Sequence, residues 1–220
     1  MLETHQRRGA ILQIRMVASL AAAFLLFAFL FLRSGGAFWF VLPMSVSLLC
    51  ALAWLAEPRE MTAMLQPGSR WAGPGLIAGS ILAAALLYWT FALGNLAARR
   101  LFPFGATEIE AVYHQGATTP RWIVALVLVL IVGPGEELFW RGYVHRRLSA
   151  SMNPMAAFTL AVLAYTGVHL ATGNLTLILA AAVCGSFWSL LYQRLGAIWI
   201  NIISHALWAA AIFVWWPMKG

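Results

Sequence analysis

The sequence of 220 residues contains no aspartate, and its acidic side chains are seven glutamates. Only 10% of its residues are charged, whereas a soluble globular domain has about 25%. In addition, 62% of the residues are hydrophobic and the mean hydropathy is +0.82. This shortage of charge excludes an ordinary soluble domain. We therefore expect an all-α, polytopic helical membrane protein.

Cysteine is scarce as well. Cys50 and Cys184 both lie within apolar runs and form no C-x-x-C spacing, so the sequence predicts neither a disulfide framework nor a cysteine metal site. The net charge of +7 comes from arginines near the ends of the apolar runs. That placement is typical of membrane topology and not of a basic stripe for nucleic acid. The expected partners are therefore the lipid bilayer and no nucleic acid.

The apolar runs predict about seven transmembrane helices, with eight as the alternative. The first, at about 17–32, is expected to be an uncleaved anchor, because Arg33 ends it and no A-x-A cleavage site follows. Residues 57–73 are expected to form a polar connection, and the segment 101–120 to form either an interfacial helix or a loop. The other six helices are expected at about 37–56, 74–97, 121–149, 153–173, 175–192 and 197–216.

These helices predict a single membrane domain with two parts. Residues 1–120 form an N-terminal region of about three transmembrane helices and a polar loop. Residues 121–217 form a core of about four helices. This core contains the polar residues of the apolar runs, from Glu136 to His205, and we expect the active-site cavity among its helices. No internal repeat is visible in the sequence, so an inverted-repeat transporter gains no support.

Positive charge predicts the orientation, because the cytoplasmic flanks of membrane helices are enriched in Lys and Arg. We expect a cytoplasmic N-terminus in the inner (plasma) membrane of a bacterium. The side of the N-terminus carries nine arginines: Arg7, Arg8, Arg15, Arg59, Arg70, Arg141, Arg146, Arg147 and Arg194. The other side carries five basic residues: Arg33, Arg99, Arg100, Arg121 and Lys219.

Three charged residues fall inside the fourth apolar run. A charged side chain at bilayer depth costs about 2.5–3.5 kcal/mol on insertion scales, so it is found mainly where it is paired, faces a cavity or takes part in chemistry. Glu137 and Arg141 are four residues apart on one helical face and are expected to pair. Glu136 has no partner nearby in the sequence. We therefore regard Glu136 as the candidate for chemistry.

Two histidines are predicted at a compatible depth. Glu136 precedes the turn at about 150–153, and His169 follows it, each by a distance of about 20–25 Å along its helix. Asn201 and His205 are four residues apart on the last helix and share a face. A carboxylate and an imidazole that meet in a cavity can activate water for attack on an amide, while the second pair stabilises the developing oxyanion.

Several alternatives remain open from the residues alone. Glu136, His169 and His205 are also a donor set for Zn²⁺ with an open water position, so the expected cofactor is either none or zinc. Glu137 with Arg141 also suits a structural ion pair, and Asn201 or His205 a helix–helix hydrogen bond. The sequence contains no G-x-S-x-G and no H-E-x-x-H, so serine and zincin-type schemes are not supported.

Three motifs in the C-terminal part resemble those of the CPBP family, the CAAX endopeptidases and bacteriocin-processing membrane proteases that are also called the abortive-infection family. The family motif E-E-x-x-x-R is matched from Glu136 to Arg141. The motif F-x-x-x-H is matched by Tyr165 to His169, with tyrosine in place of phenylalanine. The motif H-x-x-x-N (or Asp) begins at His205, but Ala209 stands in its last position.

The resemblance covers about residues 121–216 and implies an intramembrane endopeptidase. By this resemblance Glu136 activates water with His169 as its partner, and Glu137 and Arg141 support them. His205 stabilises the oxyanion or binds a metal, and we hypothesise that Asn201 stands in for the missing asparagine. The family is commonly labelled metalloprotease; we favour metal-independent chemistry.

The implied substrate is a peptide or protein at the membrane: a prenylated CAAX protein, a bacteriocin leader, a secreted peptide or the anchor of a sorted surface protein. An inactive membrane scaffold or bacteriocin self-immunity protein of the same fold is the first alternative, which Ala209 favours. A proton-coupled transporter is the second, because a Glu/His cluster also suits a proton relay. The oligomeric state stays open.

Overall fold

The computed structural model describes residues 2–66, 73–114 and 119–218, with side chains from residue 9 onward. Its regular elements within these residues are all helical. Seven helices are long and apolar enough to cross a membrane: Gly9–Arg33, Gly35–Ala56, Pro74–Leu101, Arg121–Ser149, Pro154–Thr172, Leu175–Leu195 and Ile198–Trp215. The predicted all-α class and the seven transmembrane helices are confirmed.

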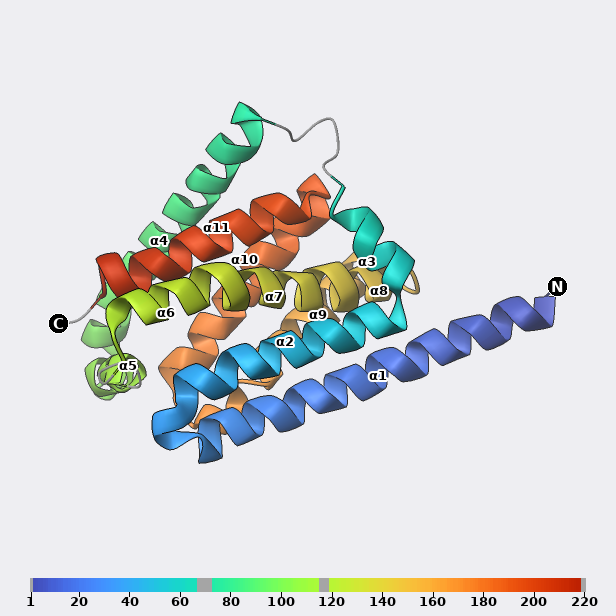
Figure 1. Cartoon of the computed structure of the whole chain (residues 1–220). Helices are drawn as coiled ribbons and strands as arrows, with labels where there is room; N and C mark the ends of the chain where they lie inside the picture. The colour runs from blue at the N-terminus through green and yellow to red at the C-terminus, as the bar shows by residue number, and fades with distance from the viewer. Residues whose placement is uncertain (1, 67–72, 115–118, 219–220) are drawn as a thin grey trace.

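The N-terminal half begins with two antiparallel helices that lie side by side (Figure 1). They are α1 (Leu2–Arg33) and α2 (Phe38–Ala56), joined by the short 3-10 turn η1 (Gly35–Ala37). α1 starts about fifteen residues before the predicted apolar run, because the polar residues that precede the run continue the helix instead of ending it.

Two further helices occupy segments that the sequence predicted to be polar. α3 (Pro58–Met64) begins on Pro58, at the first helical position that proline favours. α5 (Gly105–His114) settles the open question about segment 101–120, which is helical in this part. Between them, α4 (Pro74–Leu101) crosses the bundle at a tilt and ends with Arg99 and Arg100 in its last turn (Figure 1).

The fourth transmembrane helix runs from Arg121 to Ser149, as predicted, but its winding changes along its length. It contains two π-helical stretches, η2 (Leu128–Val132) and η3 (Glu137–His145), between α6 (Arg121–Val127), α7 (Gly133–Glu136) and α8 (Arg146–Ser149). π-Helical turns occur mainly within α-helices and often at functional sites. Here the change from α to π winding falls between Glu136 and Glu137.

Two of the last three transmembrane helices begin at asparagine N-caps. α9 (Pro154–Gly167) and the 3-10 turn η4 (Leu170–Thr172) form one of them, and α10 (Leu175–Leu195) the next. The side chains of Asn153 and Asn174 accept hydrogen bonds from Ala156 N and Leu177 N, at 2.9 and 2.8 Å, as helix N-caps do. α11 (Ile198–Ala210) and the π-helical η5 (Ala211–Trp215) complete the bundle.

The helix that carries Glu136 lies in the middle of the bundle (Figure 1). α2 packs on one side of it and α11 on the other. Gly133 makes the approach of α11 possible, because a Cβ atom at this position would lie 3.2 Å from the backbone nitrogen of Ala206. This close approach places His205 beside the two glutamates.

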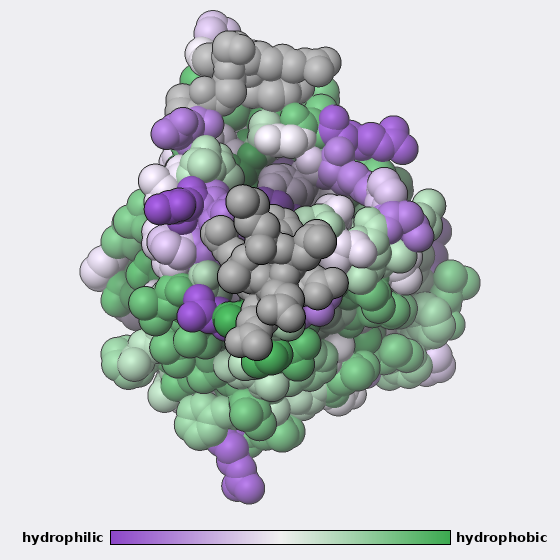
Figure 2. Space-filling view, turned by 90° about the vertical axis from the view of Figure 1, so that its right-hand side faces the viewer, coloured by the Kyte–Doolittle hydropathy of each residue, from purple (hydrophilic) through white to green (hydrophobic). Residues whose placement is uncertain are grey.

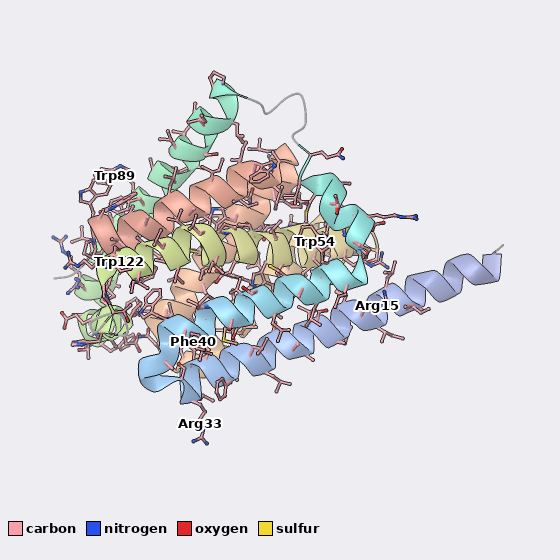
Figure 3. All side chains as sticks on the ribbon, viewed as in Figure 1. Arg15, Arg33, Phe40, Trp54, Trp89 and Trp122 are labelled. Carbon is pink, nitrogen blue, oxygen red and sulfur yellow. The ribbon has the colours of Figure 1, made fainter. Side chains whose placement is uncertain are left out.

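The flanks of the bundle are apolar, and the end near the N-terminus is polar. Figure 2 looks onto that end and shows hydrophilic side chains around its centre and hydrophobic ones along the flanks. In Figure 3, Arg33 lies at the C-terminal end of α1 and Arg15 lies partway along the helix, while Trp89 and Trp122 point outward, each 66% exposed. The chain is accordingly an integral membrane protein.

Candidate active site

The side chain of Glu137 is the centre of a fully buried polar cluster. Its Oε1 accepts hydrogen bonds from Arg141 Nη1 at 2.9 Å and from His205 Nδ1 at 2.8 Å. Its Oε2 accepts one from Asn201 Nδ2 at 3.0 Å. Both carboxylate oxygens are therefore used inside the protein, and the side chain is 0% exposed. The predicted pairing of Glu137 with Arg141 is present.

Arg141 connects this cluster to α10. Its Nη2 donates to the backbone oxygens of Cys184 and Gly185, at 3.3 and 3.2 Å. Its guanidinium carbon lies 4.8 Å from the centre of the Tyr165 ring, within the range of a cation–π contact. The charge of Arg141 is thus balanced by Glu137 and enclosed by carbonyl and aromatic groups, so this cation has a structural position within the bundle. The charge count from the sequence placed Arg141 in a cytoplasmic flank of a transmembrane helix. Its buried position removes it from that count.

Glu136 has a different environment from its neighbour. Its Oε2 accepts a hydrogen bond from the hydroxyl of Tyr165 at 2.9 Å. Among the described residues, no hydrogen bond to its Oε1 is found. Glu136 lines a cavity of about 480 Å³ between the helices. One carboxylate oxygen is therefore held in place, and the other is available to a molecule in the cavity.

His169 lies at the end of α9, one helical turn after Tyr165, and lines the same cavity. Its Nδ1 is 2.9 Å from the backbone oxygen of Tyr165. A carbonyl oxygen can only accept, so Nδ1 carries the hydrogen, and in the neutral ring Nε2 has the free lone pair. The ring is packed against Phe27 and Phe31, with centroid distances of 5.6 and 5.7 Å. Tyr165 therefore contacts both Glu136 and His169.

His205 also lines the cavity, and its orientation is fixed from two sides. Its Nδ1 donates to Glu137, which leaves Nε2 as the nitrogen available to a bound molecule. Its ring stacks on Trp188 at a centroid distance of 3.8 Å and an angle of 14°. A carboxylate on Nδ1 compensates a positive charge on the ring when Nε2 also carries a proton.

Asn201 lies behind His205 and does not line the cavity. Its side-chain nitrogen donates to Glu137 Oε2 at 3.0 Å and to the backbone oxygen of Trp188 at 2.8 Å. The residue is 0% exposed and is not among those that line the cavity. Both hydrogens of its amide are thus directed into the protein. Ala209, at the position of the family asparagine, does line the cavity with its methyl group.

A metal-binding arrangement is not formed by these side chains. Among the described residues, no three His, Cys or Glu side chains are close enough together to hold a metal ion. Nε2 of His169, Nε2 of His205 and Oε1 of Glu136 are not used inside the described part of the protein, so it is the separation of the three side chains, and not their hydrogen bonding, that leaves the zinc alternative without support.

Two contacts of the site have no counterpart in the sequence-based expectations. The hydroxyl of Tyr165 is the first, and its signal was the departure from phenylalanine in the second motif. The stacking of Trp188 on His205 is the second. No signal in the sequence distinguishes Trp188 from the other ten tryptophans, because the stack depends on how α10 meets α11.

The comparisons with known proteins agree with the three motifs. Residues 118–211 match a family described as type II CAAX prenyl endopeptidase Rce1-like. No curated protein and no solved structure matches the chain. The matched family is one of proteases, and its segment includes Glu136, His169 and His205. The predicted resemblance is thereby confirmed: residues 118–211 are similar to the type II CAAX prenyl endopeptidase Rce1-like family.

Proposed function

We propose that the protein is an intramembrane endopeptidase in which Glu136 activates a water molecule for attack on a peptide bond. The observation that carries this proposal is the difference between the two oxygens of Glu136, one held by Tyr165 and one directed to the cavity. A general base must lie within hydrogen-bond reach of the water it deprotonates. The free oxygen and the imidazole of His169 border the space where such a water would lie.

The reaction then needs only groups of this chain, water and the substrate. Water attacks the carbonyl carbon of the peptide bond while Glu136 Oε1 takes one of its protons. The lone pair of His169 Nε2 accepts a hydrogen bond from the same water and orients it. The tetrahedral intermediate collapses when the C–N bond breaks, and the proton held by Glu136 passes to the leaving amine.

The oxyanion of the tetrahedral intermediate is assigned to His205. Its Nε2, when protonated, donates to the oxyanion, and Glu137 on Nδ1 compensates the charge of the ring. Asn201 takes a positioning role in this proposal, because its amide holds Glu137 and does not line the cavity. The substrate is a peptide or protein segment at the membrane, and the protein has its N-terminus in the bacterial cytoplasm.

The experiment compares cells that express the wild-type chain with cells that express Glu136→Gln or His169→Ala. Mass spectrometry of peptide termini in membrane and secreted fractions should find cleavage products that require the wild type and are absent with either variant. A matched control is Glu60→Gln, the same change on α3 at the opposite end of the bundle, which should retain cleavage. Cleavage retained by Glu136→Gln or His169→Ala contradicts the proposal.

An inactive member of the same fold is the alternative that a specific observation favours. Ala209 presents a methyl group to the cavity where the family has a polar side chain. If the wild type yields no products and Ala209→Asn does, the chain is a scaffold or immunity protein. A proton-coupled transporter is less well supported. The described residues that line the cavity all lie in the half of the bundle opposite to the N-terminus, so they do not form a path across the membrane.

A further inference from the structure

The cavity is confined to the half of the bundle that lies opposite to the N-terminus. On α1 and α2 it is lined near the turn between them, by Phe27, Phe31 and Phe38. On α9 and α10 it is lined by residues around the turn at 173–174, beginning with His169 and Leu175. α5 borders it as well. In Figure 1 these turns, α5 and the C-terminus lie on the left, and the N-terminus, α3 and α8 on the right.

The opposite end of the bundle is closed by an ion-pair cluster. Glu57, which is 4% exposed, pairs with Arg146 and lies 3.6 Å from Arg147 Nε. Arg15 Nη1 donates to the backbone oxygen of Ala56 at 3.3 Å and so joins α1 to the same place. No described residue of α3 or α8 lines the cavity. Within the described residues the cavity therefore extends toward the α5 end and not toward the α3 end.

The depth of His169 supports the same direction of access. His169 precedes the last residue of its transmembrane helix, Thr172, by one 3-10 turn, which is about 6 Å along the axis. His169 thus lies close to the membrane surface at the α5 end, whereas Glu136 and His205 lie near the middle of their transmembrane helices.

The distribution of arginine assigns the two ends to the two sides of the membrane. Cytoplasmic flanks carry the excess of Lys and Arg, and Arg141 leaves the count because it is buried in the bundle. Arg70 and Lys219 lie outside the described residues. Of the remaining arginines, the α3 end carries Arg7, Arg8, Arg15, Arg59, Arg146, Arg147 and Arg194, and the α5 end carries Arg33, Arg99, Arg100 and Arg121.

We propose that the cavity opens on the extracytoplasmic side of the membrane and accepts apolar segments of exported proteins or peptides. This inference rests on the proposed function and names the substrate class of the same site. The rim near α5 is aromatic, with Phe102 and Phe104 among its residues, and an apolar segment gains free energy when it leaves water for such a wall. The scissile bond then lies in a membrane-embedded part of an exported protein, beside Glu136 near the middle of its transmembrane helix.

The first test measures on which side the opening lies and needs no substrate. Single cysteines are placed in a chain whose Cys50 and Cys184 are replaced by alanine. Phe104→Cys reports the rim of the cavity, Ala37→Cys the exposed turn between α1 and α2, and Ser151→Cys the exposed loop at the other end. A membrane-impermeant maleimide should label the first two in intact cells as fully as in permeabilised cells. It should label Ser151→Cys only after permeabilisation.

A second measurement covers the case in which the cysteine-free chain does not fold. A reporter is fused after the C-terminus of the intact wild-type chain. A phosphatase that is active only outside the cytoplasm should be active there, and a fluorescent protein that folds only inside should be dark. Labelling or reporter activity of the opposite pattern, or of both patterns together, overturns the proposed opening.

The substrate class is tested by where the cleavage products map. Products that depend on wild-type Glu136 should derive from exported or membrane-anchored proteins, at sites outside the cytoplasmic surface. Products from cytoplasmic proteins overturn the substrate class even if proteolysis itself is present. The complete absence of products contradicts the proposed function instead, while the labelling experiment still decides on which side the cavity opens.

Discussion

Glu136 and Glu137 are neighbours in the chain, but they belong to two regions with different hydrogen bonding. Around Glu137, every carboxylate oxygen has a partner, and Arg141, His205 and Asn201 surround it. Around Glu136, the Tyr165 hydroxyl is the one hydrogen-bond donor found among the described residues, and the side chain lines the cavity. The buried cluster provides rigidity, and the cavity wall keeps unused hydrogen-bonding capacity for a substrate and water. Two glutamates that are neighbours on one helix therefore differ in position: Glu137 is enclosed in the structure, and Glu136 is placed for the proposed chemistry.

The largest effect on stability is expected from Glu137→Ala, which breaks the buried cluster. Removing one partner of a buried ion pair leaves the other charge uncompensated and costs about 3–5 kcal/mol. Arg141 would be that charge. The measurement is thermal unfolding of the purified protein in detergent, which should show a large loss of stability and loss of cleavage together. Stability equal to the wild type contradicts the structural role of Glu137.

A smaller loss of stability is expected for Asn201→Ala. This change removes two interhelical hydrogen bonds, to Glu137 and to Trp188. Such bonds contribute about 0.6–2 kcal/mol in membrane proteins. Cleavage should fall through a lower kcat at unchanged KM, because Glu137, the partner of His205, loses one of the hydrogen bonds that hold it, while the residues that line the cavity stay unchanged. A raised KM alone would place Asn201 in substrate binding instead.

Tyr165→Phe affects the cavity and leaves the hydrogen bonds of Glu137 in place, because it removes only the hydrogen bond to Glu136. A hydrogen bond to a charged group contributes about 1.5–3 kcal/mol, and each 1.4 kcal/mol on the barrier is about tenfold in rate. We expect kcat to fall about tenfold or more, and thermal stability to fall by no more than the contribution of this one hydrogen bond. Tyr88→Phe is the matched control, since the Tyr88 hydroxyl bonds Trp216 outside the cavity. Equal activity of both variants would remove Tyr165 from the site.

The smallest effect concerns α5, which borders the cavity, and depends on pH. The Glu108 carboxylate accepts hydrogen bonds from Thr176 N, Thr176 Oγ1 and Leu175 N, at 2.8, 2.7 and 3.2 Å. Burial raises the pKa of Glu108, but these hydrogen bonds outweigh it and hold the pKa below its ordinary value of 4.5. Because the folded-state pKa is lowered, the contribution to stability is present above the ordinary value and is lost as pH falls through the folded pKa.

The corresponding measurement is the unfolding temperature of the wild type and of Glu108→Gln across pH. The wild type should be slightly more stable at neutral pH, and the difference should narrow below pH 4.5. A difference that stays constant across this range would mean that the ionised carboxylate does not hold α5 on α10.

The sequence predicts the fold and the approximate depth of the site because both depend on local patterns. Runs of apolar residues set the transmembrane helices, and the four-residue spacing of Glu137 and Arg141 sets their pairing. The direction of the Asn201 amide, the stacking of Trp188 and the bond from Tyr165 depend on contacts between helices. Those contacts follow from the close approach at Gly133 and from the π-helical turns at η2 and η3. Neither the close approach at Gly133 nor the π-helical winding can be recognised from the spacing of apolar and polar residues in the sequence.

The most direct test of the account is the pair of values, cleavage rate and unfolding temperature, for Glu136→Gln. The change keeps the shape of the side chain and removes the base, and general-base catalysis contributes about 10²–10⁴-fold to the rate. We predict a loss of cleavage of that size with an unfolding temperature close to the wild type, in contrast to Glu137→Ala. Cleavage at the wild-type rate by Glu136→Gln would show that the free oxygen of Glu136 does not activate the water.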